Sequence, residues 1–190
     1  FKMSESPAAN TRPGPLIGQH NREVFEGLLG LTHEEFAQAY EDGTFWPPSV
    51  ERFSYMNDML NGDSDNTREE LQLSRDRGES PWLQGNGSVS SESSGRGPLA
   101  GLRVLEVADE KGQWCGKLMA DLGADVIKVE APGGEATRTV GPFLDDIPHR
   151  ERSLSFWHYN TSKRGITLDI AKPNGQVLFR RLAADVDIIL

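Results

Sequence analysis

The feature that most constrains the fold of this chain is a strand–helix–strand pattern compressed into residues 102–129. The apolar run LRVLEV at 102–107 predicts a strand, and apolar side chains then follow at helical spacing over 114–122, where Gly123 ends the helix. The run DVIKV at 125–129 predicts a second strand. Two strands joined by one helix pair in parallel through a right-handed crossover. The sequence therefore predicts a βαβ unit and, with it, an α/β fold.

The same alternation continues after a long loop. Residues 165–170 predict a third strand, Pro173 suits the first turn of a helix that runs to Ala184, and 187–190 open a fourth strand. A parallel strand with nothing beyond it leaves unpaired backbone groups. We therefore expect 98–190 to be the start of an open, mostly parallel, Rossmann-like sheet, truncated within a larger domain.

Helical spacing also predicts which side chains face the sheet. In the first helix these are Trp114, Cys115, Leu118, Met119 and Leu122; in the second they are Val177, Leu178 and Leu182. Cys115 is the one cysteine of the chain, so no intrachain disulfide can form. Its place on the apolar stripe predicts a buried structural thiol rather than a nucleophile.

Residues 1–48 predict a short helical tail. One helix covers 20–29 and ends at Gly30, and a second begins at the Thr32–Glu35 capping box and ends at Gly43. Helices this short are marginal in isolation because nucleation is costly. We therefore expect the tail to pack on another surface.

Residues 49–97 are polar and acidic. Nine of the thirteen residues from 85 to 97 are Gly or Ser. Such a composition cannot bury enough apolar surface to offset the entropy of ordering, so it predicts a flexible linker.

Overall composition excludes several classes of function. The net charge of −9 argues against non-specific nucleic-acid binding and against docking on an anionic membrane. No apolar stretch is long enough to cross a membrane, and the first residues lack the order of a signal peptide, which favours the cytoplasm.

The dinucleotide, P-loop and nucleophile-elbow glycine motifs do not occur. The histidines lack metal-ligand spacing and are expected to be surface or packing residues; they are His20, His33, His149 and His158. We expect neither a metal nor a tightly bound cofactor.

Two loops could hold an anionic ligand. The segment 132–138 follows the second strand at its carboxyl end, where open α/β sheets bind ligands, and Arg138 can pair with a phosphate; the alternative is an ordinary turn with a solvated arginine. Lys163 and Arg164 lie beside the third strand, where they either hold phosphates or discourage edge aggregation. Because Arg164 lies at the amino end of that strand, the sequence favours Arg138 together with 168–172 as the ligand site.

The order of several motifs resembles the amino-terminal part of the family III CoA-transferases, a group that includes formyl-CoA and carnitine CoA-transferases and α-methylacyl-CoA racemases. The resemblance covers nearly all of 98–190 and lies in GPLAG, ADLGADVIKVE, the PGG…TR…GPF loop and KRGITLD. Residues 1–48 resemble the carboxyl-terminal tail of the same family, in the run PLIGQHNREV. The order of tail, linker and head implies the junction of a tandem protein with two modules.

The resemblance implies an enzyme that moves coenzyme A from an acyl-CoA to a carboxylic acid. In the family, an aspartate attacks the thioester and forms a mixed anhydride, and no residue up to Leu190 matches that aspartate. The positions that match or adjoin CoA-binding positions of the family are Glu110, Lys111, Leu168, Asp169 and Lys172. Ala131 and Ala171 stand where the family has a basic residue.

Other readings of the resemblance remain open. The reaction could instead be acyl-CoA racemisation or a lyase step on the same fold, or the module could be degenerate and serve for assembly. The family also implies a dimer, or a pseudo-dimer of the two modules. We expect acyl-CoA and carboxylic acid substrates, with no nucleic acid and no membrane as partners.

Overall fold

The computed structural model describes residues 8–45 and 97–190. By its internal contacts the chain divides into two units: 1–47 joined to 94–190, and 48–93. The second unit lies outside the described residues, as does the predicted linker apart from Gly97. All described residues therefore belong to the first unit.

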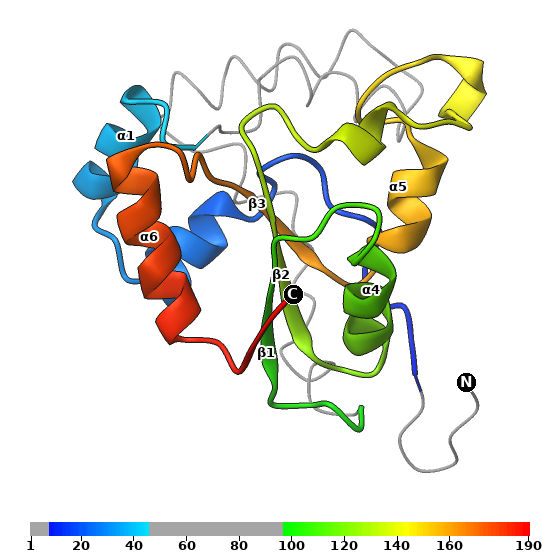
Figure 1. The fold of residues 1–190 in the computed structure, drawn as a ribbon, viewed down its shortest axis with the longest axis horizontal. Helices are drawn as coiled ribbons and strands as arrows, with labels where there is room; N and C mark the ends of the chain where they lie inside the picture. The colour runs from blue at the N-terminus through cyan, green and yellow to red at the C-terminus, as the bar shows by residue number, and fades with distance from the viewer. Residues whose placement is uncertain (1–7, 46–96) are drawn as a thin grey trace, which may run out of the picture. The chain divides into compact units, whose positions relative to one another are not determined.

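Four strands form one sheet at the centre of this unit (Figure 1). They are β1 (Arg103–Glu106), β2 (Asp125–Glu130), β3 (Arg164–Thr167) and β4 (Ile188–Ile189). Their order is β3-β2-β1-β4 and every neighbouring pair is parallel, with Val104 opposite Val126 in the register of β1 and β2. The predicted α/β fold with a parallel sheet is confirmed.

Helices cover both faces of the sheet. Helix α4 (Gln113–Asp121) joins β1 to β2, and the short α5 (Leu154–Tyr159) precedes β3; both lie on one side in Figure 1. Helix α6 (Pro173–Ala184) lies on the other side, together with the helical part of the tail. Successive strand residues point to opposite faces. Val104 therefore joins the cluster beside α4, whereas Leu105 joins the larger cluster beneath α6.

The tail is part of this core. It contains a π-helical segment, η1 (Glu23–Leu28), and helix α1 (His33–Glu41), whose capping box forms both of its hydrogen bonds. Gly30 and Gly43 have positive φ values of 68° and 71° at the ends of these helices. The larger cluster joins apolar side chains of the tail to those of the sheet and α6: Val24, Phe25, Leu29, Leu31, Ala39 and Phe45 with Leu105, Ile127, Val129, Ile166, Leu168, Leu178 and Leu182. The expectation that the tail helices need another surface is confirmed.

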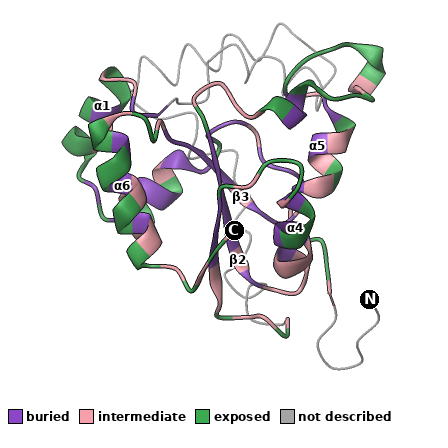
Figure 2. Ribbon diagram, viewed as in Figure 1, coloured by how far each residue is buried: buried purple, intermediate pink, exposed green. Residues whose placement is uncertain are grey.

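The predicted inward face of α4 is wrong, because the buried residues lie on the opposite side of the helix from the predicted stripe. Trp114 is 48% exposed and Cys115 is exposed, whereas Gln113, Gly116, Lys117 and Ala120 are buried (Figure 2). On this face Gly116 lies against a carboxylate: a Cβ on Gly116 would come within 1.7 Å of Glu106 Oε2. Cys115 is therefore not the buried thiol that the apolar pattern indicated.

The second helix follows its prediction more closely. It runs from Pro173 to Ala184 as expected, and Leu178 and Leu182 are buried. Val177 was also expected to face inward, but it is 51% exposed because it lies at the edge of the stripe beside Leu178. Helix α5 and the 3₁₀ turns η3 (Ala136–Thr139) and η4 (Leu144–Asp146) were not predicted within the long loop. Among the described residues, no helix is both long enough and apolar enough to span a bilayer.

Candidate functional site

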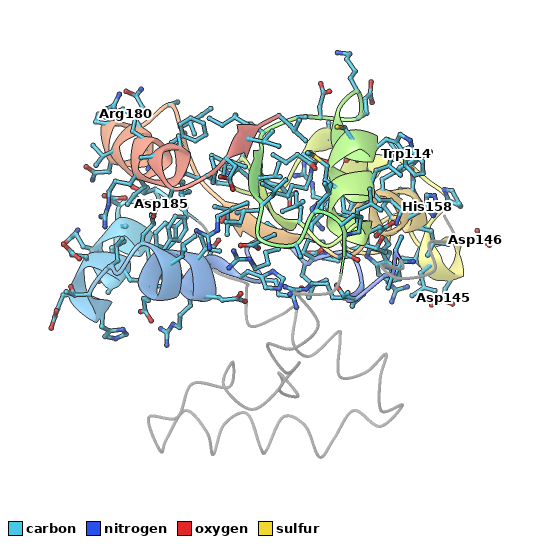
Figure 3. The ribbon with its side chains drawn as sticks, turned by 90° about the horizontal axis from the view of Figure 1, so that it is seen from below. Trp114, Asp145, Asp146, His158, Arg180 and Asp185 are labelled. Atoms are coloured by element: carbon cyan, nitrogen blue, oxygen red, sulfur yellow. The ribbon has the colours of Figure 1, made fainter. Side chains whose placement is uncertain are left out.

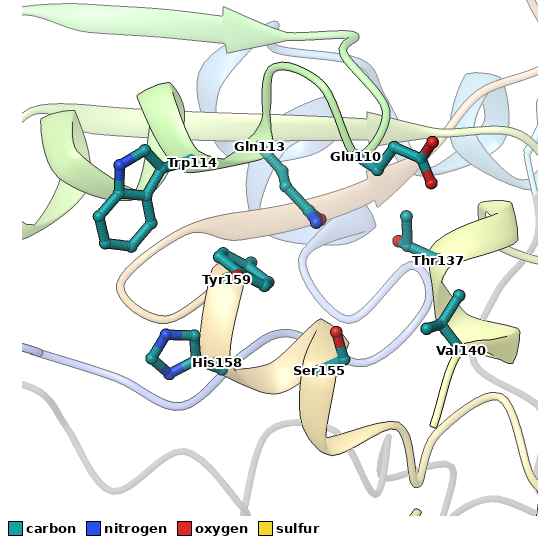
Figure 4. A pocket seen from close by; sticks show the side chains of 8 residues that line it. All are labelled: Glu110, Gln113, Trp114, Thr137, Val140, Ser155, His158 and Tyr159. Atoms are coloured by element: carbon teal, nitrogen blue, oxygen red, sulfur yellow. The ribbon is translucent and has the colours of Figure 1, made fainter. Parts of the chain in front are cut away.

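A pocket of about 540 Å³ opens near the carboxyl end of β1 (Figure 4). Three segments supply its walls: the turn after β1 with the start of α4, the η3 turn that follows β2, and helix α5. Both turns leave the sheet at the carboxyl ends of parallel strands, the edge where open α/β sheets bind ligands. The lining residues are Glu110, Gln113, Trp114, Thr137, Val140, Ser155, His158 and Tyr159.

Aromatic rings gather on one side of the pocket and polar groups on the other (Figure 4). The Tyr159 ring meets Trp114 edge-on at 5.9 Å and His158 edge-on at 4.9 Å between centroids. Glu110 and Thr137 lie across from these rings. The eight lining residues include one carboxylate and no Lys or Arg. Such a lining suits a ligand that has an apolar part next to an uncharged polar group.

The fully buried Lys163 donates a hydrogen bond to the backbone of Gln113, one of the pocket residues. Lys163 Nζ lies 2.8 Å from the Gln113 carbonyl oxygen, 2.8 Å from Asn160 Oδ1 and 3.0 Å from Glu106 Oε1. Burial lowers the pKa of Lys163 to about 8, although the Glu106 charge opposes that shift. Lys163 thereby joins the start of α4 to the end of α5 and fixes the backbone at Gln113.

A second buried lysine shares the same carboxylate. Lys128 Nζ lies 2.9 Å from Glu106 Oε1 and 2.9 Å from Glu135 Oε2. Burial opposes its charge, but the two carboxylates keep the pKa of Lys128 above its usual value. These four charges link β1, β2 and the turn before η3 beneath the pocket.

All eight residues that line the pocket lie in a part of the chain that is similar to known proteins. Residues 99–190 match the family model of CoA-transferase family III. This segment is therefore similar to CoA-transferase family III. Succinate–glutarate CoA-transferase of Agrobacterium fabrum is 43% identical over 97 residues, which cover 49% of this chain and 24% of that enzyme. Formyl-CoA:oxalate CoA-transferase of Bradyrhizobium diazoefficiens is 42% identical over 94 residues, covering 48% and 21%.

The chain therefore spans about a quarter of the length of these curated relatives. A solved CAIB/BAIF family protein from Brucella suis is 47% identical over 49% of this chain and 25% of that chain, with a TM-score of 0.44.

Within residues 99–190, the Arg138 side chain has no surface that a ligand could contact. Its side chain is fully buried, and its guanidinium lies 2.6 and 2.7 Å from the two Glu130 oxygens and 2.7 Å from Glu151 Oε2. It also stacks 3.7 Å above the Phe156 ring. Its role as a phosphate ligand stays a prediction, and these contacts favour holding the loop in place.

The other residues chosen from the sequence are separated. Glu110 lines the pocket, and the neighbouring Lys111 side chain is 83% exposed. The Asp169 N–H donates to the Thr44 carbonyl oxygen and the Lys172 ammonium donates to the Asp42 carbonyl oxygen, so both contact the tail. Leu168 is buried in the core, and none of 168–172 lines the pocket.

Arg164 lies at the amino end of β3, as the sequence indicated. Its Nε lies 2.9 Å from Asp125 Oδ1 at the start of β2, and its Nη1 lies 3.1 Å from Glu23 Oε1 in the tail. Lys163 is adjacent in sequence but points into the interior. These two cations therefore face different surroundings.

Sequence reasoning missed the aromatic wall. His158 and Tyr159 belong to α5, a six-residue helix too short for periodicity to reveal, although the run FWHY was a visible signal. Ser153 begins this helix by accepting the Phe156 N–H on its hydroxyl. Among the residues that the structure describes, no cluster of three or more His, Cys, Asp or Glu side chains could hold a metal.

Proposed function

We propose that the intact protein moves coenzyme A from an acyl-CoA to a carboxylic acid, and that the pocket after β1 receives the acyl group. The observation that carries this proposal is that the segment matched by the family is the one whose loops build the pocket. The rings of Trp114 and Tyr159 suit an acyl chain. The Ser155 hydroxyl and the Gln113 amide suit its oxygen atoms.

The chemistry proposed is covalent catalysis by a carboxylate. An aspartate oxygen attacks the thioester carbonyl carbon, a C–O bond forms, the C–S bond breaks and the thiolate leaves, so that a mixed anhydride remains. The thiolate then attacks the aspartyl carbonyl carbon of the anhydride, the C–O bond breaks and the donor acid leaves, so that a CoA thioester of the aspartate remains. The acceptor carboxylate attacks this thioester and releases the thiolate, which finally attacks the acceptor carbonyl carbon of the new anhydride and frees the aspartate. The aspartate matches no residue of this chain, so we expect the 190-residue chain alone to be inactive.

Coenzyme A needs positive charge for its phosphates. Of the residues proposed to bind it, Lys111 is the cation with the most exposed side chain, next to Glu110 at the pocket. Lys172 already donates to the tail, and Arg138 is buried. We therefore assign the accessible phosphate contact to Lys111.

The larger arrangement is also part of the proposal. Residues 1–48 are the tail of a preceding module and 98–190 the start of a second, so the chain spans a tandem junction. The two modules form a dimer or pseudo-dimer in the cytoplasm, and no cofactor is held apart from the CoA substrates.

The decisive experiment uses the intact protein with a panel of acyl-CoA donors and carboxylate acceptors, and follows new acyl-CoA by mass spectrometry. Formation of acceptor acyl-CoA supports the transferase. Inversion at the α-carbon without an acceptor would replace it by a racemase. CoA binding without either conversion would show a degenerate module.

A separate measurement tests the CoA contact on the chain itself. Titration calorimetry with CoA should show that Lys111→Ala weakens binding by roughly two- to fivefold, the worth of one exposed charge contact. Arg180→Ala is the matched control, because Arg180 is exposed on α6 at the opposite end of the unit from Trp114 and His158 (Figure 3). Equal affinities for the two variants would remove Lys111 from the site.

A further inference from the structure

A closed ring of hydrogen bonds joins the tail to a wall of the pocket. The Pro15 carbonyl oxygen accepts from Arg138 Nη2 at 2.9 Å, and Arg138 Nη1 pairs with Glu151 Oε2 at 2.7 Å. The other Glu151 oxygen accepts from the Ile17 N–H at 3.1 Å. All of these bonds are buried. Arg138 is itself part of η3, the turn that supplies Thr137 to the pocket.

The buried charges in this ring are stabilised in part by hydrogen bonds with the tail. Arg138 carries one positive charge and faces two carboxylates, Glu130 and Glu151, in a site closed to solvent. The partners of these carboxylates include two backbone N–H donors, that of Glu135 to Glu130 and that of Ile17 to Glu151. Removal of the tail would take away one donor to Glu151 and one acceptor from Arg138. A buried charge left with fewer partners is costly, so the η3 turn would have to rearrange.

The tail also supports a second wall of the pocket. The Arg12 carbonyl oxygen accepts from the Ser162 N–H at 2.9 Å, and the Thr11 N–H donates to Ser162 Oγ at 3.0 Å. Gly14 lies so close to α5 that an added Cβ would be 2.9 Å from the Trp157 Cα. Trp157 is flanked in the same helix by pocket residues, among them His158.

We infer that residues 11–17, here called the strap, form an interaction surface on 97–190 that sets the shape of the pocket. The strap itself lines none of the pocket. It acts through Arg138 and Glu151 on η3 and through Trp157 on α5, so these are positioning residues. The partner of this surface on 97–190 is the strap, a segment that precedes it in the chain. In the tandem arrangement proposed above, a segment of one module thus controls the site of the next.

The test displaces the strap without touching a pocket residue. A Cβ on Gly165, in β3, would lie 2.8 Å from both Cβ and Cγ of Pro15, so Gly165→Val pushes the strap away. Gly27→Ala is the matched control, because a Cβ at Gly27 meets nothing within 4 Å. Amide hydrogen exchange is measured by mass spectrometry on the whole chain, without substrate.

We expect Gly165→Val to speed exchange at least tenfold in 11–17, in 136–140 and in 154–159, with little change in β1. Faster exchange in the strap alone, with both pocket walls protected as in the Gly27→Ala control, would overturn the inference. Because the measurement needs no turnover, its result is independent of the proposed transferase.

A second variant decides the matter if Gly165→Val fails to fold, which far-UV circular dichroism will show. Gly14→Ala leaves every residue of 97–190 unchanged and places its Cβ against the Trp157 backbone. It should speed exchange in 154–159 together with 11–17. Unchanged exchange in α5 alongside a loosened strap would again overturn the inference.

Discussion

Gly116 is required by the group that lies opposite it. Its position on the inner face of α4 leaves 1.7 Å between an added Cβ and Glu106 Oε2, and Glu106 is held there by two buried lysines. Neither the carboxylate nor the helix can move without breaking that network.

Gly116→Ala should therefore lower the free energy of unfolding by about 1–3 kcal/mol, the usual cost of overpacking. Urea unfolding followed by circular dichroism measures it. Gly27→Ala, whose Cβ meets open space, should be neutral or slightly stabilising, because alanine in a helix avoids the entropy cost of glycine. Equal midpoints for the two variants would contradict this account.

Arg138 is the residue whose loss should be most costly. Burial alone would raise the pKa of Glu130, but the hydrogen bonds and charge of Arg138 hold it below the usual value. Arg138→Leu removes the guanidinium that both buried carboxylates contact, so we expect a loss of about 3–5 kcal/mol in the free energy of unfolding. Urea unfolding at neutral pH is the measurement. If Arg180→Ala on exposed α6 were equally destabilising, burial of the charge would not be the cause.

Among the elements, α1 depends on its first turn. Thr32 Oγ1 accepts from the Glu35 N–H at 3.2 Å, and Glu35 Oε2 accepts from the Thr32 N–H at 2.8 Å. Thr32→Ala should lower the free energy of unfolding by about 1 kcal/mol, whereas Thr32→Ser, which keeps the hydroxyl, should lose little. Thermal unfolding of both variants compares them, and an equal loss would show that the cap is not what matters.

Strand β3 lies at the edge of the sheet, and the tail satisfies part of its outer side. Gly165 exchanges two hydrogen bonds with His20: its N–H donates to Nδ1 at 3.0 Å and its carbonyl oxygen accepts from the His20 N–H at 2.9 Å. The Thr167 N–H donates to Asn21 Oδ1 at 2.9 Å. An unsatisfied strand edge is prone to aggregation, so the tail protects β3 as well as covering the sheet.

At the scale of the whole molecule, His20 makes the packing of the tail against 97–190 depend on pH. Burial, reinforced by the charges of Arg12 and Arg164, lowers the pKa of His20 to about 3, and Nδ1 must stay unprotonated to accept from Gly165. Between pH 6.5 and 3 the unfolded chain binds a proton at His20 that the folded chain does not. Its contribution therefore falls as the pH falls through that range.

At pH 5 this amounts to a loss of about 2 kcal/mol in the free energy of unfolding relative to pH 7. Urea unfolding at the two pH values measures it. His20→Asn offers an amide oxygen as the acceptor and cannot titrate, so its loss between pH 7 and 5 should be smaller by that amount. The same pH dependence in His20→Asn would assign the effect to other groups.

The order of strands and helices followed from the sequence because hydrophobic periodicity, helix caps and glycine stops are local signals. The βαβ unit, the helix that begins at Pro173 and the Thr32 capping box needed no knowledge of distant residues. Glu110 was chosen from the family resemblance, and it lines the pocket. The motifs of 98–190 were likewise sufficient to recognise the family.

The site was decided only by the tertiary structure. Arg138 and Lys163 looked like exposed cations, but each is buried. Arg138 pairs with Glu130 and donates to the Pro15 carbonyl oxygen of the tail, and Lys163 pairs with Glu106 of the distant β1. The inner face of α4 differs from the apolar stripe, and on that face Gly116 lies opposite the Glu106 carboxylate, which leaves no room for a Cβ. No local pattern contains such information. A buried charge is stable only where separate segments supply its partners, and those segments meet only once the chain has folded.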